Sequence, residues 1–245
     1  MRDSIKILST RIDNITLNDA VSIISGFLTD SNSPHQIITA NSLMVLQAQK
    51  DEELKKIFET ASVIIPESSG ICWASKFLGT PLKQKIPGID FMMRLLDYAQ
   101  NHNHSVFFLG AKEKIIQTAV EKIKKKLPNL KITGFHNGYF FQNEPKIISE
   151  IKTTQSDILF VGLNIPFQEK WIHKNLEQLG VKIAIGIGGS FDVLSGKLKR
   201  APRWMINTGT EWLFRTIQQP WRVVRILKLL LFVSKIFKAR LKSNY

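Results

Sequence analysis

The sequence of 245 residues contains a single cysteine, Cys72, which excludes a disulfide framework and a zinc site built from cysteines. It has no uninterrupted apolar run of the ~18 residues that a membrane-spanning helix needs. The N-terminus, MRDSIKILSTRID, has neither the apolar core nor the cleavage site of a signal peptide. We therefore expect a cytoplasmic protein. Cys72 is flanked by apolar residues, which favours a buried small side chain over a reactive thiol.

The sequence also lacks several motifs that would indicate a particular chemistry. It has no D-x-D motif of the kind that holds a metal–nucleotide complex, no Gly-Lys-Ser/Thr of a Walker loop and no G-x-S-x-G nucleophile elbow. None of its five histidines pairs with a suitable acid at i, i+4 on a predicted helix. We therefore expect neither a bound metal nor a resident cofactor.

Acidic residues are nearly absent from the last fifth of the chain. From Lys197 onward there are twelve lysines and arginines and one acid, Glu211, so this segment carries +11 of the net charge of +14. Such a concentration of charge requires an anionic partner: nucleic acid, a membrane surface or a phosphate-rich ligand. Nucleic acid is the weakest of the three, because the charge lies on an apolar helix and not on a groove-reading motif. We expect no nucleic-acid partner.

Strand-like and helix-like segments alternate along the rest of the chain. We predict strands at 35–40, 62–65, 105–111, 130–140, 157–166 and 181–192, with helices at 42–59, 70–79, 89–102, 112–128 and 167–180 between them. Several of the strands are apolar on both faces, which is typical of a parallel sheet covered by helices. The predicted fold class is α/β with a mainly parallel sheet and flanking helices.

The segment from Trp212 to Leu241 has a different pattern, helical with a break near Pro220. One side of the second helix is apolar (Val223, Ile226, Leu227, Leu230, Val233 and Phe237) and the other is basic (Arg225, Lys228, Lys235, Lys238 and Lys242). A basic amphipathic helix suits an anionic membrane interface. It can equally pack on its own core with a solvated basic face. Three arginines near the break, Arg215, Arg222 and Arg225, suit a diphosphate or a solvated surface.

Three predicted strands end in glycine, at Gly110, Gly162 and 186–189. Ligands of parallel sheets bind beyond the carboxyl ends of the strands, so we expect the site there. The stretch GIGGSFD (186–192) can bring backbone N–H groups to a phosphate, or it can form a tight structural turn. Within it, Asp192 can hold a ribose hydroxyl or cap a helix.

Polar side chains follow two further strands. In TANS (39–42), Thr39 and Asn41 suit the hydroxyl or acetamido groups of a sugar, while Asn41 or Ser42 can instead cap a helix. In IIPESSG (64–70) the apolar run stops at Pro66 and is followed at once by a carboxylate, Glu67. A strand that ends in this way typically delivers a side chain to a pocket.

Eight stretches of the sequence occur in a specific order: TANS…V..A..D, PESSGICWAS, LG..L..KIPGID, FFLGA, GYF, DILFVGLNIPFQEKWI, GIGGSFDVLSG.LKRAP and GTEWLFRTIQQPWRVVR. Together they resemble the WecG/TagA/CpsF family of bacterial glycosyltransferases from about residue 12 to residue 225. The resemblance implies a Rossmann-like catalytic domain at 1–195 that binds a nucleotide sugar. It also implies a basic helical appendage at 196–245 that completes the site and contacts membrane.

The resemblance further implies an inverting, metal-independent enzyme without a cofactor. Such enzymes move an N-acetylmannosamine-type sugar from a UDP-sugar to a polyprenyl-diphosphate-linked acceptor, in the assembly of cell-surface polysaccharide or teichoic acid. They act peripherally at the inner face of the cytoplasmic membrane, and the sequence leaves a homo-oligomer open.

Site residues follow from the family's motifs by position. Glu67 matches the general base, Thr39 and Asn41 match a sugar-contacting pair, and Gln168 matches a polar group near the acceptor or donor sugar. The expected nucleotide and diphosphate contacts are Tyr139, Gly162, Gly189, Asp192, Lys85, Arg215, Arg222 and Arg225.

Two positions depart from the family's pattern. The family usually has Pro-Asp-Gly where this chain has Pro66-Glu67-Ser68, so the carboxylate is one methylene longer. A base must come within about 2.6–3.2 Å of its proton. The alternative is therefore a non-catalytic family member that binds a nucleotide sugar or a lipid-linked intermediate. Lys85 stands where related sequences often have arginine; it keeps the charge and loses the guanidinium fork.

Overall fold

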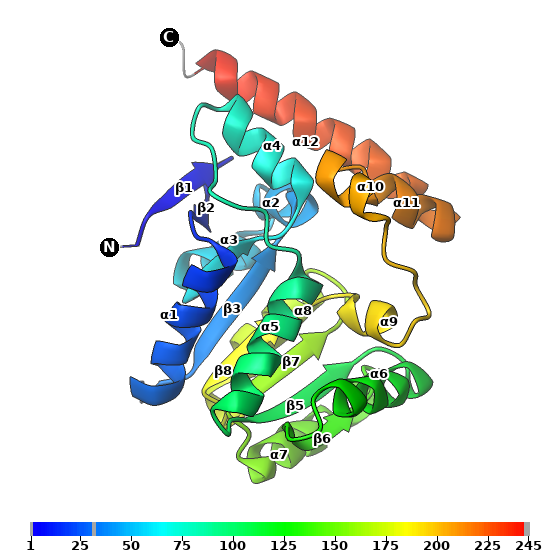
Figure 1. Ribbon diagram of the computed structural model, residues 1–245. Coiled ribbons are helices and arrows are strands. Elements are labelled where there is room, and N and C mark those ends of the chain that lie inside the picture. The colour runs from blue at the N-terminus through cyan, green and yellow to red at the C-terminus, as the bar shows by residue number, and fades with distance from the viewer. Residues whose placement is uncertain (1, 31–32, 243–245) are drawn as a thin grey trace.

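The computed structural model describes residues 2–30 and 33–242, and its centre is a six-stranded sheet (Figure 1). All neighbouring strands are parallel, in the order β4-β3-β8-β7-β5-β6. The strands are β3 (His35–Ala40), β4 (Val63–Pro66), β5 (Ser105–Gly110), β6 (Lys131–His136), β7 (Ile158–Gly162) and β8 (Ile183–Gly186). Each lies within or beside a predicted strand, so the α/β prediction is confirmed.

Helices cover both faces of this sheet (Figure 1). One face packs against α1 (Leu17–Asp30), α5 (Gly88–Asn101) and α6 (Glu113–Lys126). The other packs against α2 (Ser42–Ala48), α3 (Glu52–Thr60), α7 (Glu144–Thr154) and α8 (Phe167–Asn175). Successive strand residues alternate between the two cores: Phe107 faces one and Phe108 the other, and both are fully buried. This explains why the strands are apolar on both faces.

The helix predicted at 42–59 is in fact two helices. The chain leaves the helical conformation after Ala48, and the Asp51 side chain accepts a hydrogen bond from the N–H group of Leu54, 3.0 Å away, as the N-cap of α3. A local side-chain cap of this kind competes with continuation of the helix. The crossover from β3 to β4 thus bends around the sheet edge.

The first thirty residues contain elements that the sequence patterns did not indicate. Strands β1 (Ser4–Ile7) and β2 (Thr10–Asp13) form an antiparallel hairpin, and α1 follows it. The buried carboxylate of Asp13 accepts a hydrogen bond from the backbone N–H of Ile64 in β4 at 2.9 Å. The hairpin therefore lies against the outer strand of the sheet.

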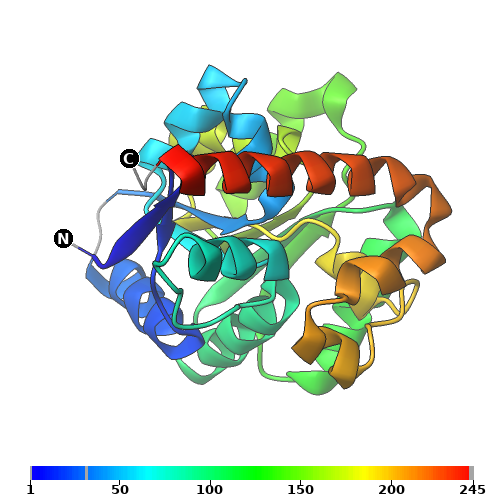
Figure 2. The same ribbon diagram turned by 90° about the horizontal axis from the view of Figure 1, so that it is seen from above.

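The C-terminal part of the chain is a series of helices that returns over the molecule (Figure 2). These helices are α9 (Ser190–Leu194), α10 (Arg203–Thr208), α11 (Glu211–Gln218) and α12 (Val223–Lys242). The helix of the body that follows β4 is α4 (Ser69–Phe77). The predicted break near Pro220 is confirmed as a short 3-10 turn at Pro220–Arg222. Helix α12 contacts α2 and α4, and its last turn reaches α4 through a hydrogen bond of 3.1 Å from Arg240 to the carbonyl of Leu78.

Helix α12 packs on the body through residues outside the apolar side of the helical wheel, so the alternative in which that side covers the core is wrong. The buried residues are Phe232 and Ile236, which join the same apolar cluster as Ile7 and Ile12 of the hairpin. On the predicted apolar side, Leu227 is 67% exposed and Leu230 is 61% exposed. Helix α12 therefore has one apolar stripe on the core and a second in solvent. None of the helices within 2–30 and 33–242 has the length and apolarity that a membrane crossing needs.

Candidate active site

The carboxyl ends of the central strands lie at one edge of the sheet. Thr39 lies near the end of β3, Gly162 and Gly186 end β7 and β8, and Glu67 directly follows β4. The chain passes from β3 outward to β4, whereas β8 reaches the other side of β3 from β7. Such a reversal of strand order opens a crevice, which is where ligands bind in parallel sheets. The appendage helices α10 and α11 lie on this side of the body (Figure 1).

Glu67 stands directly after β4 and is partly buried. Its backbone N–H donates to the carbonyl of Ala40 at 3.0 Å, which fixes the start of the loop. Its carboxylate lies at the N-terminus of α5: a Cβ on Gly88, the first residue of that helix, would be only 2.8 Å from Glu67 Oε1. The glycine therefore leaves the space that the longer side chain of glutamate occupies.

The surroundings of Glu67 give it the properties of a proton acceptor. Burial raises the pKa of Glu67 to about 7 and outweighs the charge of Arg215 and the N–H group of Gly88, which favour the ionised form. The Glu211 carboxylate raises this pKa further, and a hydrogen bond from Asn41 lowers it. A carboxyl group with a pKa near neutrality can both take and release a proton at physiological pH.

Ser68, the residue after Glu67, has a structural role. Its hydroxyl accepts a hydrogen bond from the N–H of Ile71 at 3.3 Å, as the N-cap of α4. It also accepts from the N–H of Ser42 at 3.2 Å, at the start of α2. The serine thus ties together the two helices that follow β3 and β4, on either side of Glu67.

Thr39 and Asn41 both have internal hydrogen bonds. The buried Thr39 hydroxyl donates to the carbonyl of Gly186 at 2.8 Å and so joins β3 to β8. Asn41 Oδ1 accepts from the N–H groups of Leu43 and Met44 at 3.1 and 3.2 Å, which makes it the N-cap of α2. Its amide group remains directed at the Glu67 carboxylate. The capping alternative is therefore confirmed for Asn41.

Gln168 is buried and anchors the glycine-rich turn. Its Oε1 accepts from the backbone N–H groups of Gly188 at 2.9 Å and of Leu163 at 3.2 Å, and its Nε2 donates to Glu169 Oε1 at 2.7 Å. A Cβ on Gly186 would collide with the Gln168 amide, so glycine is required for this approach. Gln168 acts on the loop that would hold a phosphate, and its own polar atoms are already bonded.

Glu169 is a site residue that the sequence patterns did not single out. Its side chain is 1% exposed, and burial raises its pKa to about 7; the hydrogen bond from Gln168 opposes this and the Glu67 charge adds to it. Its second oxygen, Oε2, has no hydrogen-bond partner among the described residues. The acid follows Gln168 in a helix whose polar residues look solvated in sequence, so only the packed structure reveals its burial.

The remaining predicted nucleotide contacts lie around the other strand ends. Gly162 ends β7, where an added Cβ would touch the Phe191 ring and come within 2.9 Å of the Gly188 carbonyl. Asp192, in the first turn of α9, pairs with Lys197 at 3.0 Å and also faces Arg222. Gly189 precedes this helix. Tyr139 follows β6 and is 67% exposed, on the far side of β7 from Glu67.

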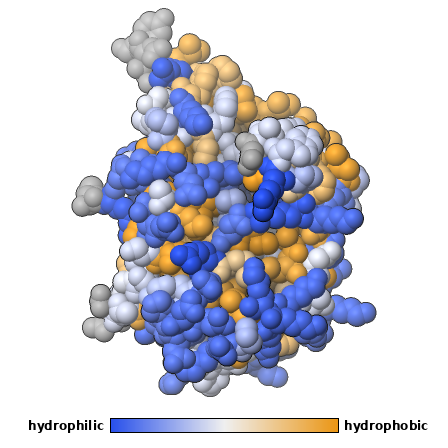
Figure 3. Space-filling model, viewed as in Figure 1, coloured by the Kyte–Doolittle hydropathy of each residue, from blue (hydrophilic) through white to orange (hydrophobic). Residues whose placement is uncertain are grey.

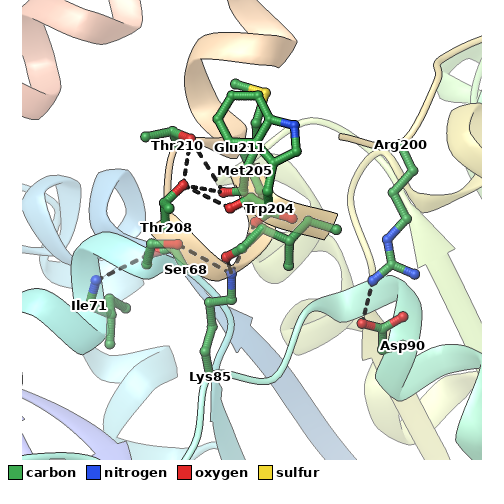
Figure 4. Close-up of polar contacts among 12 residues, drawn as sticks. Ser68, Ile71, Lys85, Asp90, Arg200, Trp204, Met205, Thr208, Thr210 and Glu211 are labelled. Carbon is green, nitrogen blue, oxygen red and sulfur yellow. Dashed lines mark hydrogen bonds and ion pairs between the residues drawn. The ribbon is translucent and has the colours of Figure 1, made fainter. Parts of the chain in front are cut away.

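Lys85 connects the body to the appendage (Figure 4). Its ammonium group lies 3.3 Å from Glu211 Oε2, 2.9 Å from the carbonyl of Ile206 and 3.3 Å from the Ser69 hydroxyl. A second ion pair joins Arg200 to Asp90 at 2.5 Å. A cavity of about 320 Å³ beside Lys85 separates the loop before α5 from α10. The predicted diphosphate contact is thus engaged by an acid of the appendage.

The three appendage arginines act on one another through their charges, and two of them also face an acid: Arg222 faces Asp192, and Arg215 faces Glu67. Within residues 2–30 and 33–242, none of Arg215, Arg222 and Arg225 forms an ion pair. Burial lowers the pKa of Arg222 to about 10, and the charges of Arg225 and Arg215 lower it further. Burial and then Arg215 also lower the pKa of Arg225. One of these guanidinium groups, that of Arg215, also lowers the pKa of Glu67. Three guanidinium groups that repel one another form a site suited to a polyphosphate anion.

In the described part of the chain, no three histidine, cysteine, aspartate or glutamate side chains gather in the manner of metal ligands. The residues that surround the strand ends are two carboxyl groups from the body, a glycine-rich turn and three arginines from the appendage.

Comparison with known proteins matches residues 5–245 to the model of the glycosyl transferase WecG/TagA/CpsF family. An N-acetylglucosaminyldiphosphoundecaprenol N-acetyl-beta-D-mannosaminyltransferase of Bacillus spizizenii is 33% identical over 94% of this chain and 90% of its own length. A protein of the same name from Staphylococcus aureus is 31% identical over 97% of this chain and 94% of its own. The chain therefore belongs to the WecG/TagA/CpsF family of glycosyltransferases.

Proposed function

We propose that this protein transfers an N-acetylmannosamine-type sugar from a UDP-sugar to an N-acetylglucosamine-type sugar linked to a polyprenyl diphosphate, in the assembly of a cell-surface polymer. The observation that carries the proposal is the position of Glu67: a carboxyl group with a pKa near 7 at the strand-end crevice, facing an arginine of the appendage. The names of the relatives from Bacillus and Staphylococcus support this substrate class.

In the proposed reaction Glu67 is the general base. Its carboxylate takes the proton of the acceptor's hydroxyl while that oxygen forms a bond to the anomeric carbon of the donor sugar. The bond from this carbon to the diphosphate oxygen breaks, and UDP leaves with the electron pair. A single displacement of this kind inverts the anomeric configuration. The proton then passes from Glu67 to solvent.

The leaving diphosphate gains negative charge, and we assign its stabilisation to Arg215, Arg222 and Arg225. Because their charges repel one another and form no ion pair within the described chain, an anion would relieve this repulsion. Guanidinium forks can supply this stabilisation without a divalent metal. The glycine-rich turn that Gln168 anchors offers backbone N–H groups to the nucleotide, and we assign the ribose and base to the region of Asp192 and Tyr139.

The acceptor's lipid would bring the protein to the inner face of the cytoplasmic membrane. Apolar surface gathers along α12 at the top of the molecule (Figure 3). Its exposed residues include Leu227 and Leu230, and Trp221 in the turn before α12 is 71% exposed. Basic side chains flank these residues, as in helices that bind anionic membrane interfaces. A homo-oligomer that covers the same surface away from membrane is part of this proposal.

The test is a transfer assay with UDP-N-acetylmannosamine and a short-chain polyprenyl-diphosphate N-acetylglucosamine, in the presence of EDTA. We expect turnover by the wild type and a loss of ~10²-fold or more in Glu67→Gln, which keeps the shape of the side chain and removes the base. Glu59→Gln, an exposed acid on α3, is the matched control and should keep full activity.

Two outcomes would count against the proposal. Full activity in Glu67→Gln would remove Glu67 from the role of base. No turnover by the wild type with any of several UDP-sugars, despite UDP binding in calorimetry, would favour the non-catalytic binding protein instead.

A further inference from the structure

A second acid is buried beside the proposed base. Glu169 lies in the first turn of α8, with its side chain 1% exposed. One oxygen accepts a hydrogen bond from Gln168 at 2.7 Å, and the other has no partner among the described residues. Burial of an isolated, ionised carboxylate costs free energy, so such a group tends to stay protonated. When it does ionise, its charge shifts the pKa of nearby titratable groups.

Two glycines show where Glu169 and Glu67 lie relative to Thr39. A Cβ on Gly186 would lie 3.2 Å from Glu169 Oε1, and the carbonyl of Gly186 accepts the hydrogen bond from the Thr39 hydroxyl. On the other side of Thr39, a Cβ on Gly88 would lie 3.8 Å from the threonine methyl and 2.8 Å from Glu67 Oε1. The two carboxyl groups therefore flank the same threonine, and the Glu67 charge raises the pKa of Glu169. Because a Coulomb interaction is mutual, the Glu169 charge disfavours ionisation of Glu67 in turn.

Few charged groups compete with this interaction. The charged groups of α11 that act on Glu67 are Arg215 and Glu211. Among the described residues, Glu67 is the one charged group that acts on Glu169. Lys170, the next residue, points away and pairs with Asp51 at 2.9 Å and Glu53 at 2.7 Å. No cation of its own helix neutralises Glu169.

We propose that Glu169 is a tuning partner of the catalytic base: the carboxyl groups of Glu67 and Glu169 bind and release protons as a pair, and this coupling sets the pH at which Glu67 becomes able to accept a proton from the acceptor. The ionised form of either residue makes ionisation of the other less favourable. Glu169 touches no substrate in this scheme and acts through Glu67. The part of the inference that concerns reaction rates rests on the proposed function.

Glu169→Gln separates this role from a structural one. The substituted amide keeps a carbonyl oxygen that can accept the hydrogen bond from Gln168, so the glycine-rich turn should remain anchored. If Glu169 acts through its charge, the acid limb of the kcat/KM profile moves to lower pH, by about half a pH unit or more. If Glu169 only accepts that hydrogen bond, the profile stays in place and the proposal is overturned. Glu59→Gln should leave the profile unchanged.

A measurement on the protein without substrate keeps the inference independent of turnover. In ¹³C NMR of glutamate-labelled protein, Glu67→Gln and Glu169→Gln identify the two carboxyl signals by their loss. We expect each remaining carboxyl group to titrate at lower pH in the other's variant than in the wild type. Unchanged titration in both variants would overturn the proposal. Coupled titration in a protein that transfers no sugar would support the pair and count against the proposed function alone.

Discussion

The body and the appendage bring side chains of opposite charge to the candidate site. The body supplies carboxyl groups, Glu67 and Glu169, which are held in place by backbone N–H groups and a glutamine and are raised in pKa by burial. The appendage supplies guanidinium groups that repel one another and form no ion pair within the described chain. In the proposed function, the body would therefore fix the geometry of proton transfer, and the appendage would hold positive charge for an incoming anion.

Attachment differs between the two sides as well. The body is closed by three apolar clusters around the sheet, whereas the first helices of the appendage expose large side chains such as Trp204 and Trp212. Two ion pairs, Lys85–Glu211 and Arg200–Asp90, join these helices to the body. The sheet therefore fixes the positions of the carboxyl groups, whereas the helix that carries Arg215 is held partly by solvent-accessible ion pairs, which are weaker.

The largest effect should come from a change on the body side that removes no charged group. Gly88→Ala places a methyl group against the Glu67 carboxylate and displaces it by roughly 1 Å, which should lower kcat by ~10²-fold with little change in KM. Steady-state kinetics test this. Gly26→Ala on α1, where an added Cβ meets nothing within 4 Å, is the control and should keep full activity. Normal kcat in Gly88→Ala would show that the carboxylate position is not critical.

The next effect concerns stability and pH. Burial raises the pKa of Glu169 in the folded protein from its ordinary value of 4.5 to about 7, so the folded protein binds more protons than the unfolded chain between these pH values. Stability should be full below about pH 4.5 and fall as the pH rises through 7, by on the order of 2–3 kcal/mol from this group. Urea unfolding of the wild type and Glu169→Gln at several pH values measures it. An equal decline in both proteins would contradict the assignment to Glu169.

A smaller effect should follow from removal of one appendage charge. Arg222→Ala should weaken UDP binding by roughly 10-fold, because a partly desolvated fork to the diphosphate is lost. Arg222→Lys should recover only part of this loss, since lysine lacks the fork. Calorimetric titration with UDP gives the affinities. Lys228→Ala, which removes an exposed charge of the same sign on α12, should bind as the wild type does; a similar loss there would mean that only net charge matters.

The smallest effect should come from the link between the two sides. A double-mutant cycle of Lys85→Ala and Glu211→Ala should give a coupling free energy of about 0.5–1 kcal/mol, typical of a pair that remains in contact with solvent. Breaking this link should also speed proteolysis within the segment 196–202. The exposed pair Lys83–Asp3, whose charged atoms are 3.7 Å apart, is the control and should couple more weakly. Equal coupling of the two pairs would argue against a specific link.

Local patterns in the sequence were sufficient for the six strands of the central sheet and for the position of Glu67 directly after β4. An apolar run that stops at Pro66 and a glycine at the ends of β5, β7 and β8 reflect requirements of the backbone itself, and these patterns predicted the sheet edge at which the candidate site lies. The break near Pro220 is local in the same sense, since proline cannot continue the helix.

Features that depend on tertiary packing could not be predicted in this way. The burial of Glu169 comes from α8 packing on the sheet, and the pairing of Lys85 with Glu211 joins residues 126 positions apart. The sequence left the packed side of α12 open, because large apolar residues lie on more than one side and a helical wheel cannot say which of them meet Ile7 and Ile12. The predicted substrate contacts remain predictions.

The shared cluster of Ile7, Ile12, Phe232 and Ile236 also bears on how the protein is made. A ribosome completes all six strands of the sheet before it adds Phe232. During most of synthesis, Ile7 and Ile12 of the hairpin therefore lack their contacts with Phe232 and Ile236. Until α12 arrives, this surface is open to chaperones. A nascent chain halted at the end of α11 would therefore carry Glu67 and Arg215 and still expose part of its core.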